Sequence, residues 1–345
     1  MTRRILIALL AALGAAALAG CGEKEETTSA PPSSQVRLML DYYPNADHAG
    51  IYAAQGTGAF ERAGLDVELV TPSDPAAPLK LLAAGKVDVA ISYEPELLLA
   101  RDQGADLVSI GALVQRPLTS IMALPKGKVR SVADLEGKTV GTAGIPYQSA
   151  YLKTILDEAG VDPASVREVN VGFNLVPAMV SGKVDATLGA FWNVEGVELQ
   201  RAERDPVIIP VDEAGVPTYD ELIFVVRAET ARERGPYLRA FLRAVAQGHE
   251  ALRENPQAGI RPLLEANPDL DRADTLAEVE ATLPAFFPED DELPFGWQDA
   301  AAWGRYGRWM VDNGLLEKPP LPRSLTNEFL PGAGIEPADD PAAAN

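Results

Sequence analysis

The sequence has little of the chemistry that many functional sites need. It contains one cysteine, Cys21, and two histidines, His48 and His249, in 345 residues. A single thiol cannot form an internal disulfide, and so few His and Cys residues cannot assemble a metal cluster. Basic residues are also scarce, with 30 Lys and Arg against 50 Asp and Glu, and the net charge of −20 repels phosphate backbones and anionic lipid headgroups. The composition therefore predicts no metal and no nucleic-acid partner.

Common catalytic motifs are missing as well. There is no Gly-x-Ser-x-Gly nucleophile turn, and Gly56-x-Gly58 is too short to be a dinucleotide-binding loop. What the chain does have is a globular composition, 47% hydrophobic and 23% charged, and a length that suits about two domains. We therefore expect a protein that is not an enzyme, without catalytic residues and without a cofactor.

The first residues are typical of an export signal. Arg3 and Arg4 precede an uncharged apolar run, residues 5–18, which predicts a signal peptide over residues 1–20. The run of 14 residues is shorter than the ~20 that a membrane-spanning helix needs. Leu18-Ala19-Gly20-Cys21 resembles a bacterial lipoprotein processing site, with Cys21 as the lipidated residue, although a chance Cys after small residues is the alternative. Residues 21–35 are rich in Ser, Thr, Pro and Glu and are expected to be a lipid-anchored flexible linker.

From residue 36 onward, short aliphatic runs alternate with helical stretches, which indicates an α/β protein. A repeated sequence motif divides this region in two. Gly85-Lys86-Val87-Asp88 and Gly182-Lys183-Val184-Asp185 each precede an aliphatic run that ends in aromatic and acidic residues. The tetrad itself can be a helix-to-strand turn and nothing more. Because ligands bind at the carboxyl ends of strands in open α/β sheets, the residues after both strands predict two half-sites that face each other.

An ordered series of motifs resembles the NMT1/THI5-like substrate-binding proteins of ABC transporters. The motifs are Asp41-Tyr42-Tyr43-Pro44-Asn45-Ala46-Asp47-His48, Ser92-Tyr93-Glu94-Pro95-Glu96, Gly144-Ile145-Pro146-Tyr147, Val171-Gly172-Phe173-Asn174 and Phe191-Trp192-Asn193-Val194-Glu195. The resemblance is strongest to members that bind the thiamine-precursor pyrimidines formylaminopyrimidine or hydroxymethylpyrimidine. It implies an extracytoplasmic receptor, expected to be a monomer, that works with an ABC permease and an ATPase and touches the membrane only through its lipid anchor.

The resemblance also implies a periplasmic-binding-protein type II fold, in which two α/β lobes are joined by two hinge strands. We expect the hinge strands near residues 120–125 and 222–227. Lobe I is then discontinuous, formed by residues 36–122 and 226–345, and lobe II is formed by residues 123–225. Closure of the two lobes on a ligand is the expected mechanism.

An aminopyrimidine is a flat ring with donors and acceptors along its edge, so its site needs aromatic faces and polar anchors. Trp192 is expected to be the first stacking residue and Glu195 the first anchor. The full set of expected ligand-binding residues is Asp41, Tyr42, Asn45, His48, Tyr93, Glu94, Tyr147, Asn174, Trp192 and Glu195. Adjacent residues point in opposite directions in extended chain, so one of Tyr42 and Tyr43 faces away. For Glu94, Asn45, Asn174 and His48 an exposed acid, a turn amide or a local backbone contact are equally open alternatives.

Other functions remain open at this stage. The receptor could bind riboflavin, whose rings also stack, or a sulfonate such as taurine, for which Arg, Lys or helix amino termini are expected in the site. A secreted pyrimidine-modifying enzyme is the alternative from another class. The fungal pyrimidine synthase of this fold carries a Lys and a His in the segment that corresponds to residues 92–96, where this chain has Ser92 and Glu96, and this chain has no Cys after Cys21.

Overall fold

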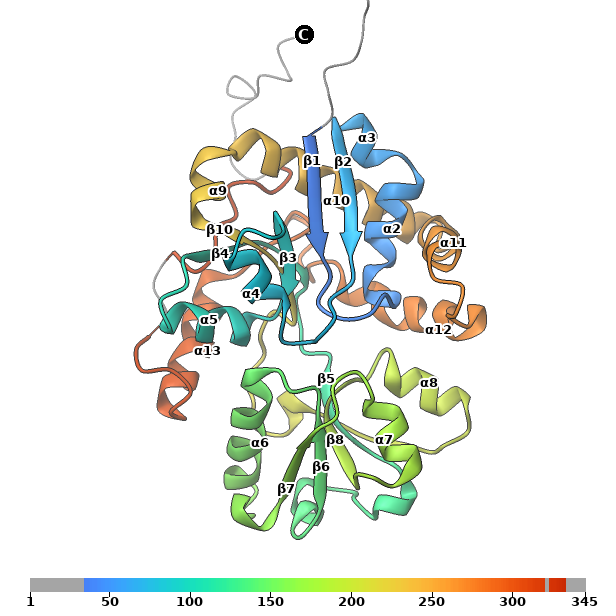
Figure 1. Cartoon of the computed structure of the whole chain (residues 1–345), viewed down its shortest axis with the longest axis vertical. Coiled ribbons are helices and arrows are strands. Elements are labelled where there is room, and N and C mark those ends of the chain that lie inside the picture. The colour runs from blue at the N-terminus through green and yellow to red at the C-terminus, as the bar shows by residue number, and fades with distance from the viewer. Residues whose placement is uncertain (1–33, 320–322, 333–345) are drawn as a thin grey trace, which may run out of the picture. The chain divides into compact units, whose positions relative to one another are not determined.

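The chain folds into two mixed β-sheets, each covered by helices (Figure 1). The computed structural model describes residues 34–319 and 323–332. The predicted signal peptide and the lipidation site at Cys21 lie outside the described residues. The predicted linker does so as well, except for Ser34 and Gln35, which begin the first strand because they pair with Leu65 and Asp66.

The first sheet has the strand order β2-β1-β3-β10-β4. Its strands are β1 (Ser34–Met39), β2 (Leu65–Val70), β3 (Val89–Ser92), β4 (Leu107–Val114) and β10 (Leu222–Arg227). The pairs β1–β2 and β1–β3 are parallel, whereas β10 lies antiparallel between β3 and β4. All residues of β3 and β4 are buried, as expected for strands covered on both faces.

The second sheet repeats this plan, with the order β7-β6-β8-β5-β9. Its strands are β5 (Thr119–Ala123), β6 (Thr139–Thr142), β7 (Arg167–Asn170), β8 (Ala186–Phe191) and β9 (Val207–Pro210). Here β5 lies antiparallel between β8 and β9, and the β6 pairs are parallel. Each sheet therefore holds one antiparallel strand that begins just after the chain arrives from the other sheet.

Helices cover both faces of each sheet. In lobe I, the first sheet with its helices, they are α2 (Ala49–Gly56), α3 (Ala59–Arg62), α4 (Pro78–Ala83), α5 (Glu94–Asp102), α9 (Ala228–Glu233), α10 (Gly235–Glu254), α11 (Gln257–Ala266), α12 (Arg272–Thr282) and α13 (Ala300–Asp312). In lobe II, the second sheet with its helices, they are α6 (Pro146–Glu158), α7 (Leu175–Ser181) and α8 (Glu195–Arg201). Short 3-10 turns include η1 (Ala46–His48). Among the described residues, no helix is both long and apolar enough to span a bilayer.

The two Gly-Lys-Val-Asp tetrads have the same structural role in both lobes. Gly85 and Gly182 end α4 and α7 with φ of +68° and +75°, a left-handed conformation that glycine adopts without strain. Asp88 Oδ2 then accepts a hydrogen bond from Arg37 N of β1, and Asp185 Oδ2 accepts one from Thr139 N of β6, both at 2.9 Å. The tetrad is thus a turn whose carboxylate binds the backbone of the neighbouring strand.

The chain crosses between the lobes outside the segments predicted as hinge strands. It leaves the first sheet after Val114 and enters the second at Thr119, and it returns between Pro210 and Leu222. The segments 120–125 and 222–227 correspond largely to β5 and β10, each of which is hydrogen-bonded into a single sheet. The expected lobe boundaries, after residues 122 and 225, accordingly fall inside these strands.

Candidate functional site

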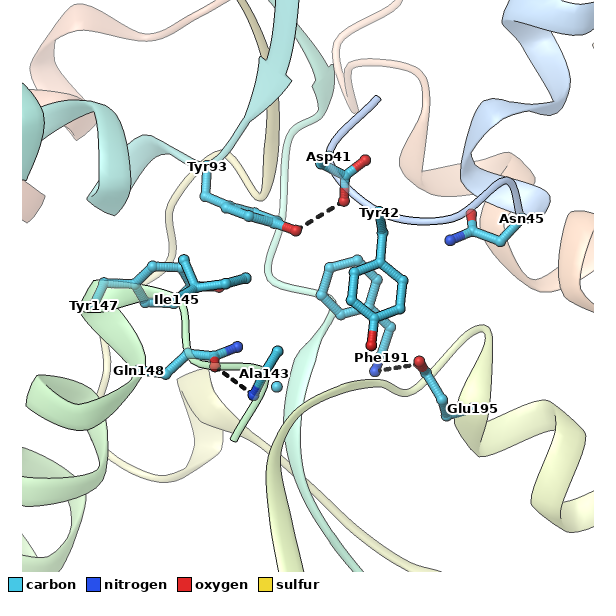
Figure 2. Close-up of a pocket in the computed structure, with 11 residues that line it drawn as sticks. Asp41, Tyr42, Asn45, Tyr93, Ala143, Ile145, Tyr147, Gln148, Phe191 and Glu195 are labelled. Carbon is cyan, nitrogen blue, oxygen red and sulfur yellow. Dashed lines mark hydrogen bonds between the residues drawn. The ribbon is translucent and has the colours of Figure 1, made fainter. Parts of the chain in front are cut away.

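A cavity opens where the carboxyl ends of strands from both sheets meet (Figure 2). Lobe I contributes Asp41, Tyr42, Asn45 and Tyr93, and lobe II contributes Ala143, Ile145, Tyr147, Gln148, Gly189, Phe191 and Glu195. The space between these walls is about 340 Å³, part of it open to solvent. The walls lie close together, so little of this space is free for a further molecule.

Asp41 is held in one orientation by two donors. It follows β1, is 1% exposed, and accepts a hydrogen bond from Tyr93 Oη at 2.8 Å. Its other oxygen lies 2.9 Å from His48 Nε2. His48 Nδ1 accepts from Asn45 N at 3.2 Å, so the imidazole proton is assigned to Nε2, and a neutral His48 donates to Asp41. The carboxylate therefore faces the cavity with fixed geometry.

Asn45 shapes the loop that carries Asp41 and Tyr42. Its side chain caps η1 by accepting a hydrogen bond from Asp47 N at 2.9 Å. Asn is favoured at such caps because its short amide reaches the free backbone N–H groups at a helix start. The remaining amide hydrogens of Asn45 are available to the cavity, which Asn45 lines.

The aromatic wall is formed by tyrosines from both lobes. The rings of Tyr93 and Tyr147 lie 5.5 Å apart at 55°, and Tyr151 backs Tyr147 edge-on at 4.9 Å. Tyr147 is fully buried near the start of α6, and its hydroxyl makes no hydrogen bond to the described residues. Burial raises the pKa of both Tyr93 and Tyr147 well above the usual value, so these phenols stay neutral.

Tyr42, rather than Tyr43, lines the cavity. Its ring packs edge-on against Phe173 of lobe II at 4.7 Å, and its hydroxyl approaches Gly172 O at 3.5 Å, the upper limit for a hydrogen bond. Tyr43 packs against the same Phe173 at 6.1 Å from outside the cavity. Tyr42 therefore reaches across the gap between the lobes.

Glu195 stands at the first turn of α8 and is 5% exposed. Its Oε2 accepts a hydrogen bond from Phe191 N at 2.8 Å, which closes the turn between β8 and α8. Burial raises its pKa to about 7, with Glu198 and Asp41 adding repulsion. Near neutral pH the carboxyl thus exists in both forms, and it can accept from an amine or donate to a ring nitrogen.

Gln148 presents its amide to the cavity from α6. Its Oε1 accepts a hydrogen bond from Ala143 N at 2.9 Å, so the amide nitrogen points away from β6. A side chain at Gly189 would place Cβ 2.3 Å from Gln148 Nε2, and Gly189 has φ of +114°. Only glycine satisfies both conditions without a shift, so Gly189 makes room for the Gln148 amide.

The structure gathers Asp41, Tyr42, Asn45, Tyr93, Tyr147 and Glu195 of the predicted site at this cavity. Three further predicted residues are not among the residues that line this cavity. His48 is fully buried behind Asp41. Asn174 is exposed and donates to Val171 O at 3.3 Å, a local turn contact. Trp192 donates from Nε1 to Pro117 O at 3.1 Å, next to the crossing into lobe II. Alternation at the end of β8 turns Phe191 into the cavity and Trp192 away from it.

Glu94, the fourth residue outside this cavity, lines a separate cavity together with Asp220, Trp297 and Trp303. It is fully buried, and its Oε2 accepts a hydrogen bond from Asp220 N at 2.8 Å. Burial and the neighbouring Asp220 raise the pKa of Glu94, and burial raises that of Asp220 to about 7. Because Tyr93 ends the extended segment and Glu94 begins α5, the two adjacent side chains diverge into different cavities.

Five lining residues were not predicted: Ala143, Ile145, Gln148, Gly189 and Phe191. Ala143 and Ile145 follow β6, and Phe191 ends β8, so the rule that ligands bind at strand carboxyl ends could have found them. Gln148 and Gly189 carry no comparable signal, because their position depends on the contact between α6 and β8.

The lining carries negative charge only. Asp41 and Glu195 are its ionisable acids, and no Lys or Arg is among the lining residues that the structure describes. The starts of α5, α6 and α8 also lie at the cavity, through Tyr93, Tyr147 and Glu195. The amino terminus of a helix favours negative charge nearby. The arrangement suits a ligand that offers hydrogen-bond donors or positive charge.

Two mixed α/β sheets, linked twice and facing a shared cavity, define the fold of the periplasmic binding proteins, as the sequence predicted. Residues 45–259 match the family described as NMT1/THI5 like, and the chain belongs to this family. The formylaminopyrimidine-binding protein of Halalkalibacterium halodurans is 39% identical, covering 82% of this chain and 87% of the relative.

Another relative is named for an enzymatic activity. The 4-amino-5-hydroxymethyl-2-methylpyrimidine phosphate synthase of Legionella pneumophila is 28% identical, covering 86% of this chain and 93% of that protein. Among solved structures, the alkanesulfonate-binding protein SsuA of Xanthomonas axonopodis pv. citri, bound to MOPS, superposes with a TM-score of 0.66 at 19% identity, covering 86% of this chain and 99% of that one. At this identity the likeness shows the fold alone.

Proposed function

We propose that the protein is the extracytoplasmic solute-binding lipoprotein of an ABC importer, which captures a thiamine-precursor pyrimidine and delivers it to the permease. Formylaminopyrimidine and hydroxymethylpyrimidine are the proposed ligands. The protein acts as a monomer, held at the outer face of the cell membrane by a lipid on Cys21, and its partners are the permease and the ATPase. The observation that carries the proposal is the cavity wall, where two buried carboxylates stand among tyrosine rings.

The wall offers a partner for each part of an aminopyrimidine. Asp41 accepts from the exocyclic amine, since both of its present donors approach from lobe I and leave lone pairs free. Glu195 shares a proton with a ring nitrogen, which its pKa of about 7 permits. Tyr93 and Tyr147 flank the ring, a contribution of ~0.5–1.5 kcal/mol for a well-placed aromatic pair. The Gln148 amide donates to a carbonyl or hydroxyl substituent of the ring.

Binding is coupled to lobe closure in this proposal. Asp41 and Tyr93 belong to lobe I, whereas Tyr147 and Glu195 belong to lobe II. A ligand that touches all four has its full set of contacts only when the lobes are together, so it shifts the population toward the closed form. The crossings at residues 115–118 and 211–221 then absorb the change in backbone angles. The closed form is the one that docks on the permease.

The cavity argues against a sulfonate ligand. A sulfonate would face Asp41 and Glu195 without a Lys or Arg among the described lining residues, and this repulsion disfavours taurine and its relatives. Riboflavin, whose rings also stack on aromatic side chains, is the remaining alternative, and the titration described below tests it.

The capture involves no chemistry. Relatives named as synthases share the fold, so the distinction rests on the residues at the site. Ser92, which the resemblance aligns with a reactive segment of the fungal enzyme, donates to Glu96 Oε2 at 2.9 Å inside lobe I, and neither residue lines the cavity. Incubation of the protein with each pyrimidine, followed by mass spectrometry, should return the pyrimidine unchanged. Turnover would overturn the receptor assignment.

Calorimetry tests the ligand and the site together. The full chain is titrated with formylaminopyrimidine, hydroxymethylpyrimidine, riboflavin and taurine, and only the pyrimidines are expected to bind. Asp41→Asn should weaken binding about tenfold to a hundredfold, because one charge-assisted hydrogen bond is worth ~1.5–3 kcal/mol. Glu233→Gln, a neutralised acid on the exposed side of α9, is the matched control and should bind like the wild type. Equal affinity of all three proteins would refute the site.

The lipid anchor is tested separately. The wild-type chain and Cys21→Ser are produced in a bacterium that processes lipoproteins, and the membrane and soluble extracytoplasmic fractions are compared. The wild type should be found with the membrane and the variant in the soluble fraction. The same distribution for both proteins would remove Cys21 as the anchor and leave the ligand assignment untouched.

A further inference from the structure

A second contact joins the lobes outside the cavity. Asn193, in the turn between β8 and α8, donates from Nδ2 to Asp47 Oδ1 of η1 and to Thr282 Oγ1 at the end of α12, both at 2.6 Å. Asn193 and Thr282 are fully buried, and Asp47 is 1% exposed. None of these residues lines the cavity. A residue of lobe II is thus hydrogen-bonded into lobe I in a place that a ligand does not reach.

The hydrogen bonds fix the orientation of the Asn193 amide. The Thr282 hydroxyl donates to Glu278 O at 2.7 Å, so it can only accept from Asn193. Both hydrogens of Asn193 Nδ2 are therefore engaged, one with Thr282 and one with Asp47. The amide oxygen, Oδ1, is left as an acceptor.

Two buried acceptors remain without donors at this contact. Asn193 Oδ1 and Asp47 Oδ2 make no hydrogen bond to the described residues. A buried acceptor left unpaired costs ~1–3 kcal/mol. Asn193 Nδ2 already donates to Oδ1 of this carboxyl group at 2.6 Å. A proton on Oδ2 would supply the donor that the contact lacks, and a hydrogen bond from it to Asn193 Oδ1 would complete a cyclic acid–amide pair.

The surroundings favour that proton. Asp47 is faced by Asp41 from the loop after β1, by Glu278 from α12 and, across the lobes, by Glu195 from α8, all of them acids. His48 is neutral in the tautomer assigned above. Arg201 of α8 acts on Glu278, but it is paired with Asp274 at 2.5 Å near the surface. Burial, followed by the charge of Asp41, raises the pKa of Asp47 well above its usual value.

We propose that Asp47 and Asn193 form a proton-dependent latch between the lobes: the lobes close with a proton on Asp47 and release it when they open. The latch rests on the lobe closure of the proposed function and adds to it a control by pH. In the open form Asp47 meets water and moves away from Glu195. Because burial is the largest cause of the raised pKa, these changes outweigh the loss of the Asn193 hydrogen bond, which by itself lowers the pKa, and the pKa of Asp47 returns toward its usual range. Because closure takes up a proton, ligand affinity falls as the pH rises, by up to tenfold per pH unit between the open and closed pKa values.

Calorimetry measures how many protons the protein takes up when it binds the ligand. Ligand binding is measured at pH 5.5, 6.5 and 7.5 in buffers of different ionisation enthalpy, which gives the number of protons taken up. Asp47→Asn imitates the protonated acid, since its amide both accepts from Nδ2 and donates to Oδ1 of Asn193. This variant should bind as tightly as the wild type at pH 5.5, bind more tightly at pH 7.5, and take up about one proton fewer. Asp66→Asn, a neutralised exposed acid of β2, is the control and should behave like the wild type.

Asn193→Leu removes the hydrogen bonds of Asn193 to Asp47 and to Thr282, and leucine has a similar volume to asparagine. It should weaken binding at pH 5.5, where the wild-type latch is complete, and lose part of the pH dependence. The latch would be refuted if Asp47→Asn took up as many protons as the wild type, or if it weakened binding as much as Asn193→Leu at every pH.

A ligand-free measurement keeps the latch separate from the ligand assignment. Small-angle X-ray scattering of the wild type should show the radius of gyration rising with pH as the lobes open, and Asp47→Asn should remain compact over the same range. Failure of the pyrimidines to bind the wild type, with this scattering difference intact, would refute the ligand and not the latch. Identical scattering of the two proteins at each pH would refute the latch.

Discussion

Replacing Glu195 by glutamine should stabilise the folded protein at alkaline pH and weaken its binding of the proposed pyrimidine ligand. The pKa of Glu195 rises from 4.5 to about 7 on folding, chiefly because burial disfavours its charged form. A group with a raised folded pKa binds more protons in the folded than in the unfolded protein, so its contribution to stability is lost as the pH rises from 4.5 to 7.

The size of the effect follows from that shift. At pH 8 the penalty for the buried charge is about 3 kcal/mol, and at pH 5 it is below about 1 kcal/mol. The glutamine side chain carries no charge at either pH, and its amide oxygen still accepts from Phe191 N, which Glu195 Oε2 binds at 2.8 Å. The variant should therefore gain about 2–3 kcal/mol of unfolding free energy relative to the wild type at pH 8 and little at pH 5.

Urea unfolding followed by circular dichroism at pH 5 and pH 8 measures this gain, with Glu233→Gln as the exposed control that should change neither value. In calorimetry at pH 7 the same Glu195→Gln variant should bind the pyrimidine more weakly, by ~1.5–3 kcal/mol if one charge-assisted bond is lost. A stability difference that did not depend on pH would refute the buried-charge argument. A gain in stability without loss of binding would remove Glu195 as an anchor.

Three further outcomes are expected. The melting temperature of the wild type should fall as the pH rises from about 4.5 to 7, because burial raises the pKa of acids such as Glu195 and Glu221 from 4.5 to about 7. His249, whose pKa burial lowers from 6.5 to about 4, offsets part of this trend, since its own contribution to stability is lost as the pH falls from 6.5 to 4. Gly189→Ala should cost ~1–3 kcal/mol of stability, measured in urea, and weaken binding, since its Cβ would meet Gln148 Nε2 at 2.3 Å; an unchanged affinity would place Gln148 outside the site. Trp192→Phe should lower the free energy of unfolding by ~0.5–1.5 kcal/mol through the lost bond to Pro117 O, with a smaller effect on ligand affinity than Tyr147→Ala; the reverse order in calorimetry would restore Trp192 as the stacking residue.

Much of the architecture could be predicted locally. The runs of aliphatic residues in β3 and β10, and the left-handed glycines at Gly85 and Gly182, are set by short-range pattern and backbone preference. The hinge strands were displaced for a different reason. The segments near residues 120–125 and 222–227 were predicted as connecting strands. In the structure β5 pairs with β8 and β9, and β10 pairs with β3 and β4, so each of these strands belongs to one sheet.

The candidate site divides in the same way. Asp41, Tyr93 and Glu195 follow strands and could be placed at the strand ends by topology alone. Whether a neighbouring side chain joins them depends on the direction in which it leaves the backbone. Tyr42 faces the cavity and Tyr43 does not, Phe191 faces it and Trp192 does not, and Glu94 leaves α5 toward a second cavity.

The amino-acid order by itself determined the two α/β halves, their matching Gly-Lys-Val-Asp turns and the kind of chemistry at the strand ends, because these depend on contacts within a few residues of chain. Only the tertiary structure decided that Gln148 lies next to Gly189 and that Asn193 is hydrogen-bonded to Asp47. Such contacts join segments as far as 146 residues apart, and they depend on how the helices pack on the sheets and how one lobe lies against the other. The burial that raises the pKa of Asp47 and Glu195 also depends on the tertiary structure, because both lobes must be in place to cover these side chains.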